Sequence, residues 1–381
     1  MTAKYPLCFV QLFILLLTSL PITQAYSREP ISIIPDEQHQ TYSEIESSSY
    51  SEAMPIKQLL NDLKGSRIND GDFAYTHNQF EIGHRWGAFE LAIFWRYDYF
   101  LTFSPDTAWL FYLDKNVDSN NKTIDKQPSL ELKNYNVRLS ANHIQSQGAA
   151  VGYSFHLLPE LAVKTRLNYF NSGAMTNGSL TGNITTSLDD YSGTLYLDYA
   201  YKHDSLLQRK EESILGQGLG IDIDVFWQLT DKISLYVQGR DVFSYIMWRD
   251  VTYTKATAIT DRVSYDENGT IHVIPNVSGI NDYRKQIQRL PNRYLLDLNY
   301  QLEDWQLALQ WYRYDNFNFP RFMFGSREKI VDWHLGYDVK TSAVEFGLEH
   351  SSISFKVKSD RLALSKAHDF SLSLSVNYLI E

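Results

Sequence analysis

The chain has 381 residues, with 45 acidic and 35 basic side chains, a formal net charge of −10, one cysteine and 26 tyrosines. This acidic balance argues against a nucleic-acid-binding protein, which would carry a basic surface. With 44% hydrophobic and 21% charged residues, the chain is too apolar to be disordered overall. Its length fits either two or three ordinary domains or one large all-β body.

Residues 1–25 have the layout of a secretory signal peptide. Lys4 provides a basic start, residues 7–20 form an apolar stretch, and Ala25 is a small residue at the predicted cleavage position. The apolar run is short for a membrane-spanning helix, so we predict a cleaved signal rather than a permanent anchor. Cys8 lies inside this segment, so the mature chain would have no thiolate for metal binding or catalysis.

Residues 26–72 are predicted to form a polar periplasmic tether with one short helix. Residues 26–54 are rich in Ser, Glu and Gln and show no apolar periodicity. Residues 55–65 begin with proline, end with glycine and carry their apolar side chains on one helical face. We expect a partly frayed helix at the mouth of the main body; the alternatives are a segment that plugs this body and one that docks a periplasmic partner.

From residue 73 to residue 381 the apolar pattern has a period of two. The clearest alternating runs, each typical of a strand with one apolar face, are 89–99, 161–169, 219–229, 305–311 and 370–378. Tight turns are predicted near 159–160, 230–231, 303–304 and 339–340. Longer polar loops are predicted at 115–128, 171–189, 202–215, 276–290 and 316–329. Short turns on one side and long loops on the other are typical of an outer-membrane barrel.

Alternation alone does not distinguish a membrane barrel from a soluble β-sandwich. Aromatic residues near the strand ends favour the membrane, because such rings prefer its two interfaces. They are Trp95, Tyr97, Tyr99, Trp227, Trp305, Trp311 and Tyr378. Charged residues in mid-strand favour a polar lumen, where they would steer a solute or pair with opposite charges on neighbouring strands. They are Arg96, Asp98, Asp222, Asp224 and Arg240.

We therefore predict an all-β fold, a transmembrane antiparallel up-and-down β-barrel of about 12 to 14 strands with a short N-terminal helical and tether segment. Residues 73–381 resemble Gram-negative outer-membrane β-barrels. Within that class, the run from Gly216 to Asp224, Gly-Gln-Gly-Leu-Gly-Ile-Asp-Ile-Asp, looks like the glycine-and-aspartate strand of long-chain fatty-acid transporters. This resemblance implies a location in the outer membrane and an N-terminal hatch that plugs the lumen.

Motifs for catalysis are scarce. The chain has no Gly-x-Ser-x-Gly elbow, no His-Glu-x-x-His helix and no phosphate-binding glycine loop. His350 and Ser352 are two apart on a predicted strand, facing lipid near the outer leaflet, and the slip of apolar phase after them predicts a bulge. The pair resembles the His and Ser of outer-membrane phospholipases and lipid A deacylases, although Ile353 stands where those enzymes have Asn.

The favoured prediction is a porin-like channel or transporter for a small or amphipathic solute. One alternative is a lipid hydrolase using Ser352 and His350. Another is a scaffold or receptor for a surface or periplasmic assembly, with residues 26–72 as the contact. We expect the lipid bilayer and a small solute as partners, and no cofactor, metal or nucleic acid.

Overall fold

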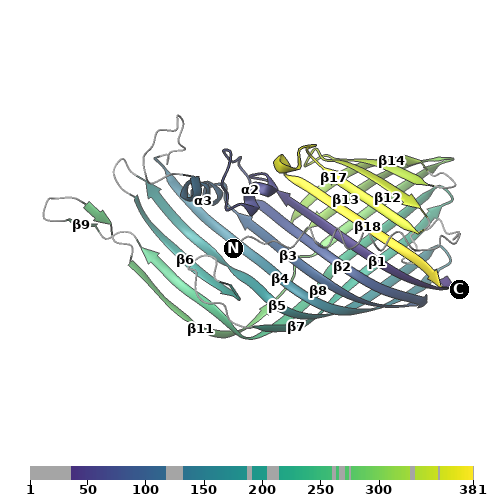
Figure 1. Ribbon diagram of the computed structural model, residues 1–381, viewed down its shortest axis with the longest axis horizontal. Helices are drawn as coiled ribbons and strands as arrows, with labels where there is room; N and C mark the ends of the chain where they lie inside the picture. Colours follow the sequence, from purple (N-terminus) through teal and green to yellow (C-terminus); the bar gives the residue numbers. More distant parts are fainter. Residues whose placement is uncertain are drawn as a thin grey trace, which may run out of the picture.

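The computed structural model describes residues 36–116, 132–186, 191–203, 214–259, 263–265, 271–273, 276–326, 331–350 and 352–380. The predicted signal peptide lies outside these residues, as do most of the predicted loops 115–128 and 202–215. Within the described part of the chain, fourteen strands form a closed antiparallel barrel, which confirms the predicted fold class (Figure 1). In the same ranges, no helix is long and apolar enough to cross a membrane.

The barrel strands are, in chain order, β1 (Asp36–Ser51), β2 (Phe73–Gly87), β3 (Phe89–Phe103), β4 (Asn134–Leu158), β5 (Leu161–Thr186), β7 (Leu215–Thr230), β8 (Ile233–Ile259), β12 (Arg293–Leu302), β13 (Trp305–Tyr314), β14 (Phe317–Ser326), β15 (Asp332–Asp338), β16 (Val344–His350), β17 (Ile353–Ser359) and β18 (Asp369–Ile380). The helices are α2 (Ile56–Leu60), α3 (Pro105–Asn116) and the 3-10 turn η1 (Leu364–Lys366).

The exposure pattern along the strands is the reverse of that in a water-soluble protein. On β3, Leu91, Ile93 and Trp95 are exposed, whereas Glu90 and Arg96 on the opposite face of the strand are buried. Charged groups therefore face the barrel interior and large apolar groups face outwards. Because a contiguous exposed apolar surface is costly in water, this belt requires a bilayer around it.

Residues 36–51 correct the predicted boundaries, because they form barrel strand β1 and not a tether. This strand closes the ring by pairing with β2 on one side and β18 on the other. Its inner face carries polar groups such as Glu44 and Glu46, while its outer face carries Ser43 and Ser47. A strand that is polar on both faces has no apolar alternation, so only its hydrogen-bonded neighbours reveal it.

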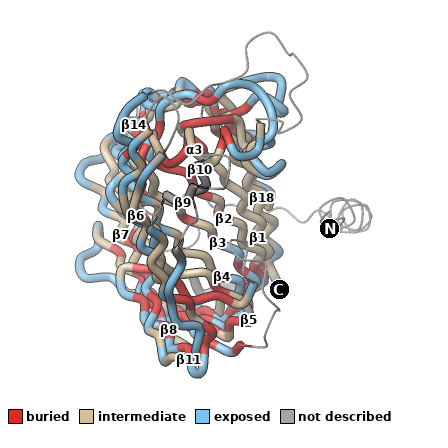
Figure 2. The backbone as a smooth tube through the Cα atoms, turned by 90° about the vertical axis from the view of Figure 1, so that its left-hand side faces the viewer, coloured by how far each residue is buried: buried red, intermediate tan, exposed pale blue. Residues whose placement is uncertain are grey.

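Three predicted loops are also strands. Residues 171–189 lie mostly in β5, residues 276–290 mostly in β11 (Asn276–Gln288), and residues 316–329 mostly in β14. Together with β4, β8 and β6 (Tyr191–Tyr201), β5 and β11 extend the wall far beyond the rest of the barrel, to the left in Figure 1. A small separate hairpin joins β9 (Val263–Tyr265) to β10 (Ile271–Val273). In Figure 2 the buried stretches gather at α3 and around β4, β5 and β8.

The tight turns near 159–160, 230–231 and 303–304 lie at the same end of the barrel as the C-terminal end of β18. Short turns mark the periplasmic end of such barrels and longer loops the extracellular end, so the opposite end is extracellular. The turn near 339–340 lies at the extracellular end, because β15 runs outwards and β16 returns. Helix α2 lies at that end as well, and not on the periplasmic side where we predicted it.

This orientation predicts opposite labelling of two single-cysteine variants in a chain whose only natural cysteine is Cys8. Arg361→Cys lies in the connection from β17 to β18 at the extracellular end, and Ser352→Cys lies in a periplasmic turn. We expect a membrane-impermeant maleimide to label the first variant in intact cells and the second only after lysis. The reverse pattern would invert the assigned orientation.

Candidate functional site: the barrel lumen

A buried guanidinium connects β3 to β8 across the lumen. Arg96 donates to Asp98 on its own strand at 2.6 Å, and its two terminal nitrogens donate to Asp241 of β8 at 2.9 and 2.6 Å. Strands β4, β5 and β7 separate β3 from β8 around the ring, so this bidentate pair crosses the interior. All three side chains are buried. Two predicted lumen residues, Arg96 and Asp98, thus belong to one crossbridge.

A local irregularity of β8 turns Asp241 into the lumen. The β7–β8 register shifts between Ile221 and Ile223, and Asp241 has a φ of 55°. Such a kink re-aims a side chain away from the regular alternation. The predicted residue Asp222 holds the kink, because its carboxylate accepts a hydrogen bond from the Asp241 backbone N–H at 2.8 Å. A period-two pattern cannot identify Asp241, because the kink breaks that period.

A second group of charges braces the lumen between β5 and the first strands. Arg166 of β5 donates to both carboxylate oxygens of Glu81 on β2, at 2.7 and 2.6 Å. Tyr42 of β1 donates its hydroxyl to the same carboxylate at 2.7 Å. Lys164 donates to Glu90 of β3 at 2.6 Å. The partners lie on strands far apart in the sequence, so only the closed fold brings them together.

The remaining predicted lumen residues pair between neighbouring strands. Arg240 of β8 donates to Asp224 of β7 at 2.8 Å, and the Tyr236 hydroxyl donates to the same carboxylate at 3.1 Å. This is the cross-strand pairing that the sequence suggested as one of two roles. The structure therefore brings the five predicted residues into two connected units.

A histidine that no sequence pattern singles out links β1 to this network. The His77 ring on β2 is buried, with Nδ1 2.5 Å from Asp98 Oδ1 and Nε2 3.6 Å from Glu46 Oε2. Asp98 thus contacts a guanidinium and an imidazole at once. Such a network stays stable only while every charge in it keeps a partner.

Nearer the extracellular end, aromatic rings from opposite walls meet in the lumen. This constriction is formed by Tyr50, Phe73, Tyr75, Phe100, Tyr314 and Phe319, with Tyr312 and Phe317 packed against them. The rings of Phe73 on β2 and Phe317 on β14 stack with centroids 3.7 Å apart and an interplanar angle of 3°. Five strands separate β2 from β14 around the ring, so the stacked pair bridges the lumen.

Three further contacts tie the constriction together. Tyr75 meets Tyr314 edge to face at 4.8 Å, and Tyr50 meets Phe319 at 5.4 Å. Lys340, in the extracellular turn after β15, lies 5.4 Å from the Phe319 ring. These arrangements are the ones that aromatic rings and cations prefer. The sequence did not select these rings, because inward aromatic residues follow the same alternation as outward ones.

Helix α3 and the connection from β1 to β2 cover the extracellular end. Their buried cluster contains Ala53, Met54, Ile68, Ala108 and Tyr112. The Asn116 side chain at the end of α3 donates to the backbone oxygens of Leu63 and Tyr112, at 3.0 and 2.8 Å. The two extracellular connections are therefore packed into one unit at this end.

The aromatic residues predicted at the membrane interfaces lie on the outer face of the barrel. Six of them are exposed there, and Tyr99 is partly exposed. Trp227, Trp305 and Tyr378 lie towards the periplasmic ends of their strands, and Tyr99 and Trp311 lie towards the extracellular ends. Two such levels are what the aromatic girdles of a membrane barrel require.

His350 and Ser352 do not share a strand, which corrects the prediction made for them. His350 is the last residue of β16 and pairs with Ile353 of β17, while Ser352 belongs to the turn between. The slip in apolar phase therefore marks a chain reversal and not a bulge. Because β16 runs towards the periplasm, both residues lie near the periplasmic end and not near the outer leaflet. Hydrolysis by this pair stays a prediction.

Among the described residues, no group of three or more His, Cys, Asp or Glu side chains is placed to hold a metal ion.

The closed ring, the apolar outer face and the charged interior define a transmembrane β-barrel of the outer-membrane type. Comparison with protein-family models and with curated sequences gives no match. Among solved structures, the barrel is similar to the TodX deltaS2S3 mutant, a monoaromatic hydrocarbon channel, with a TM-score of 0.43, 10% identity and coverage of 92% of this chain and 93% of that one.

The Ralstonia pickettii toluene transporter TbuX gives a TM-score of 0.41 at 10% identity, covering 90% of this chain and 89% of that one. A Pseudomonas aeruginosa FadL homologue gives a TM-score of 0.22 at 11% identity, with 90% of each chain covered.

Proposed function

We propose that this barrel is an outer-membrane channel for small apolar or amphipathic solutes, which enter through the aromatic constriction. The observation that carries the proposal is the ring cluster that bridges the lumen between β1–β3 and β13–β14. Ring faces attract apolar and aromatic molecules, and they exclude strongly hydrated ions. An aromatic site that bridges the lumen therefore selects for solutes with an apolar part.

The charged network supports the same function by its geometry. Arg96 donates hydrogen bonds to the Asp98 and Asp241 carboxylates at 2.9 Å or less, and Arg166 does the same to the Glu81 carboxylate. Buried charges that are paired in this way brace the wall and offer few free sites to an ionic solute. We therefore assign the network to wall support and the constriction to solute selection.

The constriction acts as the gate in this proposal, and widening it should raise the ionic conductance of the barrel. The double variant Phe73→Ala/Phe317→Ala removes the stacked pair that bridges the lumen. In planar bilayers we expect short, rare openings from the wild type and long openings of several-fold larger conductance from the variant.

A matched control removes two stacked rings from the outer face. Trp305 of β13 and Phe324 of β14 stack with centroids 5.1 Å apart, and both are exposed outside the lumen. The variant Trp305→Ala/Phe324→Ala leaves the lumen unchanged and should keep the wild-type conductance. Equal conductance in all three proteins, each shown to be folded, would contradict the assigned gate.

The route to the membrane completes the proposal. Residues 1–25 would direct export and be removed after Ala25, so that the mature chain begins at Tyr26. N-terminal sequencing of the purified barrel tests this directly. A first residue within the apolar segment 7–20 would contradict the cleavage.

A further inference from the structure

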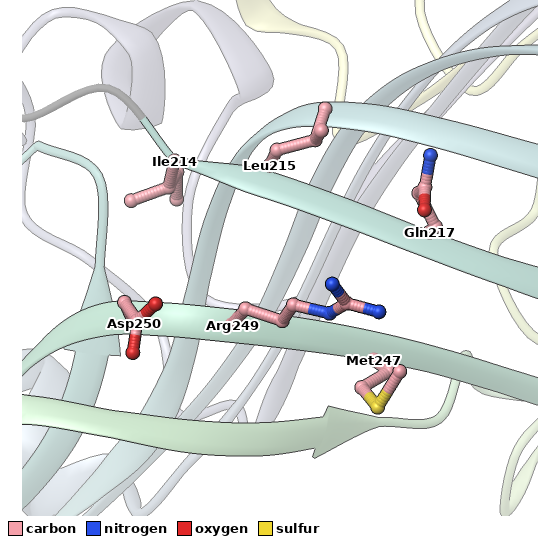
Figure 3. Close-up of a pocket in the computed structure, with 6 residues that line it drawn as sticks. All are labelled: Ile214, Leu215, Gln217, Met247, Arg249 and Asp250. Atoms are coloured by element: carbon pink, nitrogen blue, oxygen red, sulfur yellow. The ribbon is translucent and has the colours of Figure 1, made fainter.

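Among the described residues, the pairing along one side of β8 is interrupted between β6 and β7, away from the constriction. Strand β6 pairs with β8 as far as Ala200, opposite Tyr253, and β7 resumes the pairing at Leu215, opposite Arg249. In the described part of the chain, residues 250–252 of β8 therefore have no strand partner on this side. At the interruption lies a pocket of about 300 Å³ (Figure 3), lined by Ile214, Leu215, Gln217, Met247, Arg249 and Asp250.

The pocket opens on the outer face of the wall. Trp248 and Ile246 are fully buried on the inner face of β8, so the alternating Met247 and Arg249 point outwards. Across the strand pair, Leu215 lies opposite Arg249 and Gln217 lies opposite Met247. Leu215 is 55% exposed. The pocket thus joins apolar side chains to a guanidinium on a surface that faces the bilayer.

A second cation lies beside Arg249 on the next strand. The β8–β11 register pairs Val251 with Arg284 and Trp248 with Gln286. The single residue Lys285 therefore lies opposite the two residues Arg249 and Asp250 at an irregularity of the strand pair. Arg284 and Gln286 point inwards, where they bond Asp198 and Asn177, so Lys285 points outwards with Arg249. Like charges in cross-strand neighbours repel, so an anion placed between them is attracted to both.

Neither cation forms an ion pair with any residue that the structure describes. Among the described residues that line the pocket, Asp250 is the only acidic one, and it has a φ of 51°. In Figure 3 the Arg249 guanidinium reaches towards Gln217 and Met247, away from the Asp250 carboxylate. The positive charge is therefore directed to the pocket and not neutralised by its acidic neighbour.

The level of the pocket fits the outer-leaflet headgroups. On the outer face of β8, Phe243, Tyr245 and Met247 are exposed in succession towards the extracellular end, and Arg249 follows them. Ile287 of β11 pairs with Met247 and adds another exposed apolar side chain. These apolar side chains thus lie deeper in the membrane than the two cations. A lipid has the same order, with its acyl chain deeper than its anionic headgroup.

We propose that this pocket binds an anionic, phosphate-bearing lipid of the outer leaflet. Its phosphate lies between Arg249 and Lys285, and its acyl chain lies along Leu215, Met247 and Ile287. The lipid lies against the outer face of β8 beside residues 250–252, which have no strand partner on this side among the described residues. This site is separate from the solute path, so its failure would leave the proposed channel untouched.

The test uses the full barrel in detergent, titrated with diphosphorylated lipid A and followed by native mass spectrometry. The variant Arg249→Gln/Lys285→Gln removes both cations. We expect its affinity for lipid A to fall at least about tenfold, since each lost charge-assisted hydrogen bond is worth that factor or more. The variant Arg249→Lys/Lys285→Arg keeps both charges and should restore most of the binding.

The control variant Arg361→Gln/Lys366→Gln removes two exposed cations from the connection between β17 and β18 and should bind lipid A like the wild type. A second arm titrates inorganic phosphate alone, for which we expect no saturable binding. Wild-type affinity for lipid A in Arg249→Gln/Lys285→Gln would overturn the site. Equally tight binding of inorganic phosphate would overturn its assignment to a lipid.

Discussion

Deleting residues 26–72 should abolish assembly of the barrel. The deletion removes β1, which pairs with β2 from His39 to Ser51 and with β18 from His39 to Tyr50. Without it, β2 and β18 would each present a row of unpaired backbone groups. Within a bilayer such open edges are not tolerated, because no water is available to satisfy them. We expect the loss of the folded band in a heat-modifiability gel and full sensitivity to protease.

A plug that occupies the lumen predicts the opposite result for the same deletion, namely a folded barrel of raised conductance. Leu60→Ala is the matched control, because this exposed side chain of α2 lies within the deleted range but outside the wall. It should fold like the wild type. A folded deletion protein would contradict the assignment of β1 to the barrel wall.

Replacing Arg96 by methionine should destabilise the barrel by about 3 to 5 kcal/mol, because the change leaves Asp98 and Asp241 buried without their shared cation. The free energy of unfolding can be measured by urea titration of the barrel in lipid vesicles. Arg313→Met is the matched control. That guanidinium lies at the extracellular end of β13 and bonds the backbone oxygen of Asp315 and the Asn316 side chain. We expect a loss of less than about 1 kcal/mol there.

A fourfold variant separates the pairing from the burial. Arg96→Met/Asp98→Leu/Asp241→Leu/Arg293→Met removes the charges together, including the buried Arg293, whose terminal nitrogen lies 3.5 Å from Asp241. Replacing a whole buried ion cluster by apolar side chains is often neutral. We expect it to recover a large part of the stability that Arg96→Met alone loses. Equal losses in Arg96→Met and Arg313→Met would show that the crossbridge contributes nothing to the wall.

The alternation in the sequence predicts the barrel where one strand face is apolar. Strands β3, β7, β13 and β18 have that pattern, and their closed antiparallel arrangement is the predicted one. Strand β1 lacks this pattern because it is polar on both faces. The extracellular half of β5 lacks it because it extends beyond the apolar belt. Their place is decided by backbone pairing with neighbours, a property that no single run of residues contains.

The site could be predicted only in part, for a related reason. Arg96 and Asp98 are visible as charges in an alternating run, and the sequence points to them. Asp241 and His77 are their partners only because the ring closes, and a kink aims Asp241 inwards. The phase slip after His350 shows the same limit, since a bulge and a tight turn change the alternation in the same way.

Solute entry into proteoliposomes tests the channel most directly. Salicylate, a small aromatic anion, is compared with glucose in vesicles containing the folded wild-type barrel and in protein-free vesicles. A lumen gated by aromatic rings predicts faster entry of salicylate through the barrel, with glucose entry unchanged. If salicylate enters no faster than into protein-free vesicles, or if glucose enters equally fast, a channel selective for apolar and amphipathic solutes is contradicted.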